Sequence, residues 1–538
     1  MKRSSALWLT LILAVTLARI AMTWRLFSVT RDEPVHVAAG YDYLKHHTFL
    51  DIEQPPLPGA FFALLLLNQP EPDSTQWIRR GNSVLADHGR YMHGTAKARA
   101  GNVVFVVIAT LALFFWTRDL FGDTVALIAV AIFGNLPPAL AHAGLATPDL
   151  AATAAFALAM LVYDRWLAQP SWRRTASLAV AIAFGTLCSF SFPLFFLIGA
   201  AFLSLGSGRL VRSCAAAAAL SRGPSGRDVR SPFIARAVCG IAIAFVIAWG
   251  AYFFSIGTMK SVDRRSREWL RQTFHTSGIE RHWQVPAPAL FTGVLAAMND
   301  KGMGEAFLLG EHSDRGWWYY FPVTLAVKTP LPMLALAVAG AMLAARRERH
   351  GDVAAIALGL LGFAMVSHVN LGIRYILPVY VPLSMLAAYA VVAGWELSKR
   401  HRAAVALALL WLLADGVLAH PDYLPWMNAL AGPHPERVLA DSNFDWGQDL
   451  VRLRTVCRNR GIDRLGVLFN ASAASDQLWL PPFDPNPIGP YSPVNGWVAV
   501  GETPLQVNQA VDPNSYTWLT ANRPYVRVGK TIRLYHVE

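Results

Sequence analysis

Residues 175–206 read TASLAVAIAFGTLCSFSFPLFFLIGAAFLSLG and decide how the chain crosses a membrane. The run is 32 residues long and largely apolar, whereas one membrane-spanning helix needs about 20 such residues. Ser189, Ser191 and Pro193 interrupt it near its middle, where they favour a turn. We therefore predict two spans in this stretch, joined by a tight re-entry.

The composition indicates that lipid surrounds most of the chain. Of 538 residues, 54% are hydrophobic and only 15% are charged, against about 25% charged residues in an average soluble domain. The formal net charge of +12 lies mainly in short loops between apolar runs, where arginine orients spans. We therefore set nucleic acid aside as a partner, and the four cysteines imply no disulfide framework.

Nine further stretches are long and apolar enough to span a membrane, which predicts a polytopic α-helical protein with about 11 transmembrane helices. They are residues 6–24, 101–117, 123–142, 147–167, 235–256, 321–344, 352–368, 373–395 and 402–419. We interpret the first stretch as an uncleaved span, because no small-residue cleavage site follows it.

The distribution of basic residues supports this number of spans. With a cytoplasmic N-terminus, eleven spans place the basic loops inside, as short cytoplasmic loops require. These loops contain Arg118, Arg165, Arg173, Arg174, the 207–236 segment, Arg346, Arg347, Arg349, Lys399, Arg400 and Arg402. A single span at 175–206 would invert every later loop. We predict a multi-pass protein of the inner (plasma) membrane whose C-terminal domain is extracytoplasmic.

Two domains follow from this topology. Residues 1–419 form the predicted transmembrane domain, with outer loops at 25–100 and 257–320, and residues 420–538 form a small extracytoplasmic α/β domain. Its strand-like runs are residues 496–500, 525–528 and 532–537. In the first outer loop, apolar residues recur at helical spacing and predict helices that lie in the membrane interface.

Acidic residues cluster on the predicted outer side. Asp32 and Glu33 follow the first span, Glu53 comes about twenty residues later, and Asp149 begins the fourth span. A single carboxylate there is readily a hydrated loop charge, but a carboxylate at the start of a span is a site hypothesis. Asp149 also suits a helix cap, and the two roles are compatible. We predict Asp32, Glu33 and Asp149 as catalytic residues.

Basic and aromatic residues on the same side are candidates for binding an anionic lipid-linked substrate. Lys328 lies inside an apolar stretch, where it must reach outward or meet an anion such as a lipid phosphate. Arg374 begins a span, and its planar fork suits phosphate. The alternative is a plain headgroup anchor. The predicted substrate- and phosphate-binding residues are Glu53, His36, Lys328, Arg374, Tyr375 and Arg315.

A divalent metal is a candidate cofactor, although no ligand motif supports it. His36, His142 and Glu53 have the chemistry to join Asp32 around a metal ion, but their spacing resembles no closed site. No glycine-rich phosphate cradle or paired-cysteine motif occurs.

Several short motifs, in this order and with this sidedness, resemble the C-class integral-membrane glycosyltransferases. The likeness is nearest to the protein O-mannosyltransferase-like, carrier-lipid-dependent branch, which is related to the lipid A aminoarabinose transferases. The motifs are Asp32-Glu33, Gln54-Pro55-Pro56-Leu57, Thr147-Pro148-Asp149, WWYYFP at 317–322, Lys328-Thr329-Pro330, Arg374-Tyr375-x-Leu-Pro and DSNFDWGQDL at 441–450.

The resemblance implies an inverting transfer of a sugar from a polyprenyl-phosphate carrier to a hydroxyl acceptor, with Asp32 as the catalytic aspartate. The partners would be the lipid-linked donor, membrane lipid and an unknown acceptor. The chain departs from the aminoarabinose transferases at Val35, where they carry arginine, and at Gln54, where they carry lysine. Lys328 and Arg374 are expected to compensate for these missing cations.

Other interpretations stay open at this point. A retaining reaction would need two carboxylates about 5 Å apart. A transporter or flippase would share the many spans, although such proteins favour matching broken halves, which the sequence does not show. In a scaffold protein, the outer tail would bind a partner. For residues 441–450 we prefer a local role, a helix start capped by Asp441 or Ser442, over catalysis.

Overall fold

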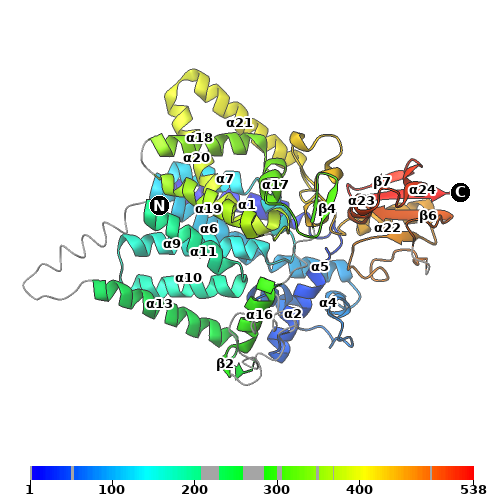
Figure 1. The fold of residues 1–538 in the computed structure, drawn as a ribbon, viewed down its shortest axis with the longest axis horizontal. Coiled ribbons are helices and arrows are strands. Elements are labelled where there is room, and N and C mark those ends of the chain that lie inside the picture. Colours follow the sequence, from blue (N-terminus) through cyan, green and yellow to red (C-terminus); the bar gives the residue numbers. More distant parts are fainter. Residues whose placement is uncertain are drawn as a thin grey trace, which may run out of the picture.

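The structure is a computed structural model that describes residues 3–49, 54–206, 230–258, 284–299, 306–346, 350–367, 369–484 and 488–538. Glu53, residues 259–283 and 300–305 of the predicted 257–320 loop, and most of the basic 207–236 segment lie outside the described residues. Within the described part, two regions follow each other along the longest axis, a helical bundle and a smaller α/β region (Figure 1).

The helical elements of the bundle are α1 (Arg3–Ala21), α6 (Val103–Phe121), α7 (Asp123–Phe133), α8 (Pro137–Ala143), α9 (Asp149–Ala168), α10 (Trp172–Cys188), α11 (Phe192–Gly206), α13 (Arg230–Ala251), α17 (Tyr320–Lys328), α18 (Leu331–Arg346), α19 (Gly351–Ser367), η3 (Ile373–Val379), α20 (Tyr380–Leu397) and α21 (Lys399–Leu418). Several long helices of the bundle, among them α6, α9 and α10, run roughly side by side along that axis (Figure 1), and shorter ones such as α17 are bent away from it.

The predicted polytopic helical fold is confirmed, but the number of eleven spans is not. Six helical segments among the described residues are long and apolar enough to cross a membrane, and two bent pairs raise the number to eight. Residues 175–206 do form two helices, α10 and α11, with a break at residues 189–191 where the Ser189 and Ser191 hydroxyls lie 2.9 Å apart.

The stretch predicted as one span at 321–344 is sharply bent. Helices α17 and α18 meet at an angle of 114°. Thr329 between them has extended backbone angles, as expected for the residue before Pro330, and a proline has no N–H to continue a helix. The bend places Lys328 at the end of α17, beneath the outer surface of the bundle.

The first outer loop folds into the predicted short helices, joined by close backbone contacts. They are α2 (Glu33–His46), α3 (Pro56–Ala63), η1 (Leu64–Leu66), α4 (Trp77–Leu85) and α5 (Tyr91–Ala100). Helices α2 and α3 cross at Gly40 and Gly59, where a Cβ atom on Gly40 would lie only 1.8 Å from the Gly59 carbonyl oxygen. Glycine is therefore required at this crossing.

Part of the second outer loop is also described. It contains α16 (Pro288–Asn299) and two antiparallel two-stranded sheets. The strands are β1 (Ile256–Gly257) with β2 (Val285–Pro286), and β3 (Ala306–Leu308) with β4 (Glu311–Ser313). Leu308 also bridges to Leu439, which connects this loop to the C-terminal region.

A four-stranded sheet confirms the predicted α/β character of the C-terminal region. Its order is β5-β6-β8-β7, with β5 parallel to β6 and β8 antiparallel to both of its neighbours. The elements are η4 (Ala429–Ala431), η5 (Pro435–Arg437), η6 (Asp441–Asn443), α22 (Leu450–Arg460), β5 (Gly466–Leu468), β6 (Gly496–Gly501), α23 (Glu502–Val511), α24 (Thr517–Thr520), β7 (Val526–Val528) and β8 (Ile532–Val537). The division at residue 419 stays a prediction.

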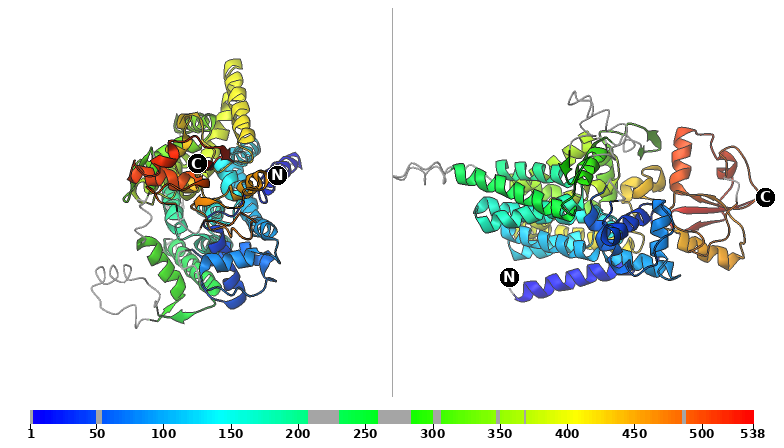
Figure 2. Two further views of the ribbon diagram at one scale, coloured as in Figure 1. Left: turned by 90° about the vertical axis from the view of Figure 1, so that its right-hand side faces the viewer. Right: turned by 90° about the horizontal axis from the view of Figure 1, so that it is seen from below.

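The two ends of the chain lie at opposite ends of the molecule (Figures 1 and 2). The N-terminus is at the end of the bundle that carries the α9–α10 turn, whereas α2, α4, α5 and the C-terminal sheet lie toward the other end. This separation agrees with the predicted sidedness, and the compartment on each side stays a prediction.

The sidedness predicts which positions a membrane-impermeant maleimide reaches. We expect Trp479→Cys, whose native side chain is 74% exposed, to be labelled in intact spheroplasts. Arg400→Cys, at the start of α21, should be labelled only after lysis. Both variants are made in a background whose four cysteines are replaced by alanine. Equal labelling of both before lysis would contradict the topology.

Candidate active site

The centre of the site is an ion pair between residues 342 positions apart. Asp32 precedes the first turn of α2, and Arg374 lies in the 3-10 turn η3 at the start of the span that continues as α20. The Arg374 Nη1 atom donates to Asp32 Oδ2 at 3.0 Å. The Asp32 side chain is 32% exposed and that of Arg374 is 15% exposed, so solvent or a ligand can reach the pair.

Arg374 gathers further groups around it. Its Nε donates to the Leu371 carbonyl at 3.1 Å, and its Cζ lies 4.6 Å from the centroid of the Trp446 ring. Asp149 and Asp441 also interact with this guanidinium electrostatically. Three carboxylates that are distant in sequence therefore surround one arginine.

Asp149 pairs with a fully buried histidine. The Nδ1 atom of His142, from α8, lies 3.4 Å from Asp149 Oδ2, and the His142 side chain has no exposed surface. In the described part of the chain, neither ring nitrogen makes a well-aligned hydrogen bond. Helix α9 begins at Asp149 without a side-chain cap, so capping does not account for this carboxylate. Buried polar groups without partners are often functional.

Glu33, predicted as catalytic, is buried and forms an ion pair with Arg99. Its carboxylate is 1% exposed and binds Arg99 through two hydrogen bonds of 2.8 Å. It also accepts the backbone N–H groups of Thr30 at 2.7 Å and Ala146 at 2.8 Å. Burial alone would raise the pKa of Glu33, but the Arg99 charge and these hydrogen bonds lower it below its ordinary value. The contacts indicate a structural role.

Lys328, predicted to bind phosphate, is enclosed by the protein. Its side chain is 1% exposed, and Nζ donates to the carbonyls of Leu424 at 2.6 Å, Trp426 at 2.8 Å and Asn443 at 2.8 Å. A lysine ammonium has three N–H donors, so none is left for a phosphate. The geometry differs from the prediction and indicates that Lys328 fixes the chain that follows α21.

An open cleft lies near the ion pair, although neither Asp32 nor Arg374 lines it. Its empty space is about 500 Å³, part of it open to solvent, and its lining includes His36, one turn along α2 from Asp32, and Pro148, next to Asp149. Most of the remaining lining is aromatic or proline, including Tyr43, Phe62 and Tyr252. The cleft offers an apolar wall beside the polar centre, which suits a lipid-linked or sugar ligand.

The other predicted binding residues are placed differently. Tyr375 stacks on Phe321, with centroids 5.7 Å apart, and meets Phe195 edge-on at 5.4 Å, so it forms part of the wall behind Arg374. Arg315 is exposed on the loop after β4, where its backbone N–H donates to the Ser313 hydroxyl at 3.2 Å. Its role stays a prediction, as does that of Glu53, outside the described residues.

Residues 441–450 contribute to the site in a way that the sequence analysis missed. The predicted helix start is wrong, because α22 begins only at Leu450 and no side chain of Asp441 or Ser442 caps it. The segment instead begins with the short 3-10 turn η6. At its first residue, Asp441, the backbone φ is positive at 52° and the N–H donates to the Thr503 hydroxyl. Trp446 is thereby placed against Arg374. The signal was the tryptophan within a motif that is mostly polar.

Asn443 of the same segment joins this region to η3. Its Oδ1 accepts the Ile373 N–H at 2.9 Å, and its Nδ2 donates to the Tyr320 hydroxyl at 3.1 Å. Gly372, with φ of 85°, lies so close that a Cβ atom there would be 2.7 Å from Asn443 Nδ2. Glycine is thus required for the turn that presents Arg374.

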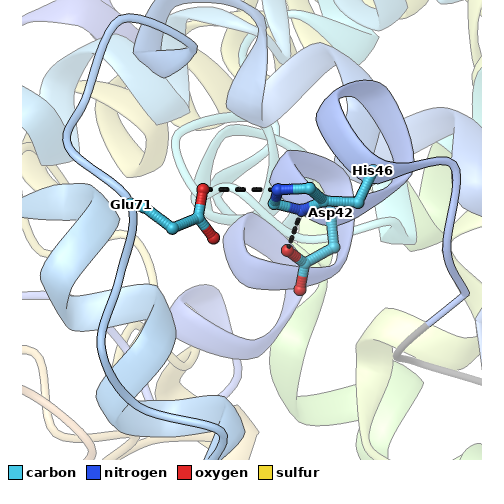
Figure 3. A group of neighbouring side chains, drawn as sticks. All are labelled: Asp42, His46 and Glu71. Atoms are coloured by element: carbon cyan, nitrogen blue, oxygen red, sulfur yellow. Dashed lines mark hydrogen bonds and ion pairs between the residues drawn. The ribbon is translucent and has the colours of Figure 1, made fainter.

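Asp32, His36 and His142, the described members of the metal-ligand set proposed from the sequence, are not gathered into one group. Among the described residues, the side chains placed to share one ion are Asp42, His46 and Glu71, with the His46 ring between the two carboxylates (Figure 3). Arg80 neutralises this group, because it donates to Asp42 Oδ2 and Glu71 Oε1, each at 2.8 Å. An ion network therefore accounts for these three residues without a metal.

The comparisons with known proteins support the resemblance. Residues 7–259 match the family model of dolichyl-phosphate-mannose-protein mannosyltransferase. The match includes Asp32, His142 and Asp149, and it confirms over this part of the chain the likeness to C-class integral-membrane glycosyltransferases. It supports a glycosyltransferase-type enzyme. No curated protein matches the chain.

Solved structures show a distant likeness. Apo ArnT from Cupriavidus metallidurans is 15% identical with a TM-score of 0.48, covering 81% of this chain and 68% of that one. ArnT bound to undecaprenyl phosphate is 13% identical with a TM-score of 0.47 and covers 98% of each chain. The apo oligosaccharyltransferase from Archaeoglobus fulgidus is 15% identical with a TM-score of 0.41, covering 91% and 62%.

The buried Glu33–Arg99 pair predicts a large stability effect. We expect Glu33→Gln to lower the free energy of unfolding by about 3–5 kcal/mol, because Arg99 would keep its charge without a charged partner. Because the folded-state pKa is lowered, the stabilisation by Glu33 is complete above its ordinary value of 4.5 and is lost as the pH falls through the lower, folded-state value. Thermal unfolding in detergent as a function of pH measures both effects.

The matched control for this prediction is Glu71→Gln. Glu71 is 51% exposed, so its replacement should cost at most about 1 kcal/mol. A Glu33→Gln protein as stable as the control would show that the pair does not hold the first loop.

Proposed function

We propose that the protein is an inverting glycosyltransferase that moves a sugar from a polyprenyl-phosphate carrier to a hydroxyl acceptor on the extracytoplasmic face. The observation that carries the proposal is the accessible Asp32–Arg374 pair, which joins a carboxylate and a cation beside the apolar cleft. The family match, whose description names a dolichyl-phosphate sugar, supports a lipid-phosphate carrier.

In the proposed reaction, Asp32 acts as the general base. The acceptor oxygen attacks the anomeric carbon of the donor, and its proton passes to the Asp32 carboxylate. The bond between the anomeric carbon and the phosphate oxygen breaks in the same step, and both of its electrons leave with the lipid phosphate. Asp32 Oδ2 receives the Arg374 hydrogen bond, so Oδ1 is the oxygen that takes the proton.

Arg374 stabilises the leaving group. The departing lipid phosphate gains negative charge, and a fixed cation at that position favours the transition state over the ground state. Nη1 and Nε of Arg374 have protein partners, while Nη2 has none among the described residues. The Nη2 protons are therefore the donors that we assign to the phosphate.

The neighbouring groups position the acceptor and the donor. Asp149, held beside His142, adds a second carboxylate that can accept a hydrogen bond from a sugar or acceptor hydroxyl. The cleft next to His36 offers apolar surface for the sugar ring or the first part of the lipid. Glu33 supports Asp32 from below, because its contacts with Thr30 and Arg99 fix the chain immediately before α2.

Replacement of the base should remove most turnover. We expect Asp32→Asn to lower kcat about a hundred- to ten-thousandfold, because the amide cannot take the proton. The measurement is transfer of labelled mannose from polyprenyl-phosphate mannose, and then from other carrier sugars, to cell-envelope acceptors by the purified protein. The control is Asp73→Asn, an exposed carboxylate of the same loop.

A fully active Asp32→Asn enzyme would remove Asp32 from the mechanism. A product with the donor's anomeric configuration would replace inversion with a retaining reaction. Movement of the labelled lipid across vesicles without sugar transfer would instead favour a transporter.

The two cations that the sequence analysis grouped together should behave differently. We expect Arg374→Lys to unfold at nearly the wild-type temperature but to lose about 10²–10³ in kcat, because an ammonium lacks the planar fork that holds Asp32 and a phosphate in fixed geometry. Lys328→Gln should lose about 1–3 kcal/mol of stability for each buried carbonyl left without a donor. Unfolding temperature and kcat are measured for both variants.

The opposite pattern would contradict this assignment. If Lys328→Gln stayed fully stable and lost only donor binding, Lys328 rather than Arg374 would be the phosphate ligand.

A further inference from the structure

Trp446 belongs to the C-terminal region but contacts one member of each pair in the site, Arg374 of the Asp32–Arg374 pair and His142 of the His142–Asp149 pair. Its side chain is 1% exposed. One face of the indole lies 4.6 Å from Arg374 Cζ, and its ring meets His142 at an angle of 63°, with centroids 6.3 Å apart. Arg374 binds Asp32, and His142 binds Asp149. One aromatic residue therefore contacts the partner of each of the two carboxylates that we assign to the reaction.

The backbone of Trp446 holds the loop that carries Asp32. The Trp446 carbonyl accepts the N–H of Arg31, the residue before Asp32, at 3.1 Å. The Trp446 N–H donates to Gln448 Oε1 at 2.7 Å, so both backbone groups are satisfied. Trp446 is thus fixed to the first outer loop by hydrogen bonding and to Arg374 by ring contact.

The neighbours of Trp446 connect it to both regions of the molecule. Ser28 donates its hydroxyl to the Gly447 carbonyl at 2.8 Å and its N–H to the Gln448 carbonyl at 3.0 Å. The Asp449 carboxylate accepts the N–H groups of Lys530 at 3.0 Å and Thr531 at 3.2 Å, just before β8. The C-terminal sheet therefore determines where residues 446–448 lie against the first loop.

We infer that Trp446 is a positioning residue that orients the Arg374 guanidinium, and that the C-terminal region is thereby an integral part of the catalytic centre. This inference rests on the proposed function. A guanidinium binds phosphate through a planar fork, so its plane must be fixed for the hydrogen bonds to align. The indole face fixes that plane from one side and excludes water there, while Nη1 is held by Asp32 and Nη2 remains for the donor.

Substitutions at Trp446 test this role through activity. We expect Trp446→Leu to lower kcat about 30-fold, the change that corresponds to loss of a desolvated cation–π contact. Trp446→Phe keeps an aromatic face and should retain more activity than Trp446→Met, an apolar side chain without a π face. The control is Trp479→Leu, an exposed tryptophan of the same region, which should keep wild-type kcat and KM.

A double-mutant cycle separates positioning from a merely structural effect. If Trp446 acts through Arg374, Trp446→Leu should add little further loss of kcat in the Arg374→Gln background. If Trp446 only stabilises the fold, its loss should be the same in both backgrounds. The probe is polyprenyl-phosphate mannose, or whichever carrier sugar supports turnover, with the unfolding temperature recorded for each protein.

The outcomes distinguish this inference from the proposed function. If Asp32→Asn is fully active, the proposed function fails. If Asp32→Asn is inactive but Trp446→Leu equals Trp479→Leu, only the role of Trp446 fails. Additive losses in the double-mutant cycle also overturn that role. If Trp446→Leu does not fold, equal activity of the Phe and Met variants overturns it instead.

Discussion

The outer half of the molecule depends on one buried ion pair, Glu33 with Arg99. All five N–H groups of Arg99 have acceptors, two on the Glu33 carboxylate and three on the carbonyls of Trp24, Phe27 and Ser28. A buried charge pair is tolerated only when its hydrogen bonds are satisfied in this way. The pair therefore fixes the position of the chain that follows the first span. Asp32, which directly precedes Glu33, is held in place by it.

The need to satisfy buried charge also explains why Lys328 and Arg374, both predicted to bind phosphate, differ in the structure. Lys328 meets three backbone carbonyls and has no donor to spare, so it organises the chain between α21 and the C-terminal sheet. Arg374 meets one carbonyl and one accessible carboxylate, and within the described part of the chain its Nη2 has no partner. Burial alone does not explain why the two residues have different roles. The number of protein acceptors around each cation explains the difference.

The site is assembled from three parts of the chain that are far apart in sequence. The first loop supplies Asp32, the outer ends of α8 and α9 supply His142 and Asp149, and η3 supplies Arg374. Residues 441–450 lie against all three, through hydrogen bonds to Arg31 and Leu371 and through ring contacts of Trp446. The C-terminal region is therefore connected to the chemistry by contacts and not only by the chain.

The sequence by itself determined the helical character of the chain, the break at residues 189–191, the strands of the C-terminal sheet and the acidic residues Asp32 and Asp149. Those features depend on local composition and periodicity, because lipid requires long apolar helices and strands alternate over a few residues. Only the tertiary structure decided that Arg374 pairs with Asp32, that Lys328 is enclosed by carbonyls and that Trp446 lies in the site. These contacts join residues that are far apart in the sequence, and no local pattern encodes which acceptors will surround a buried cation.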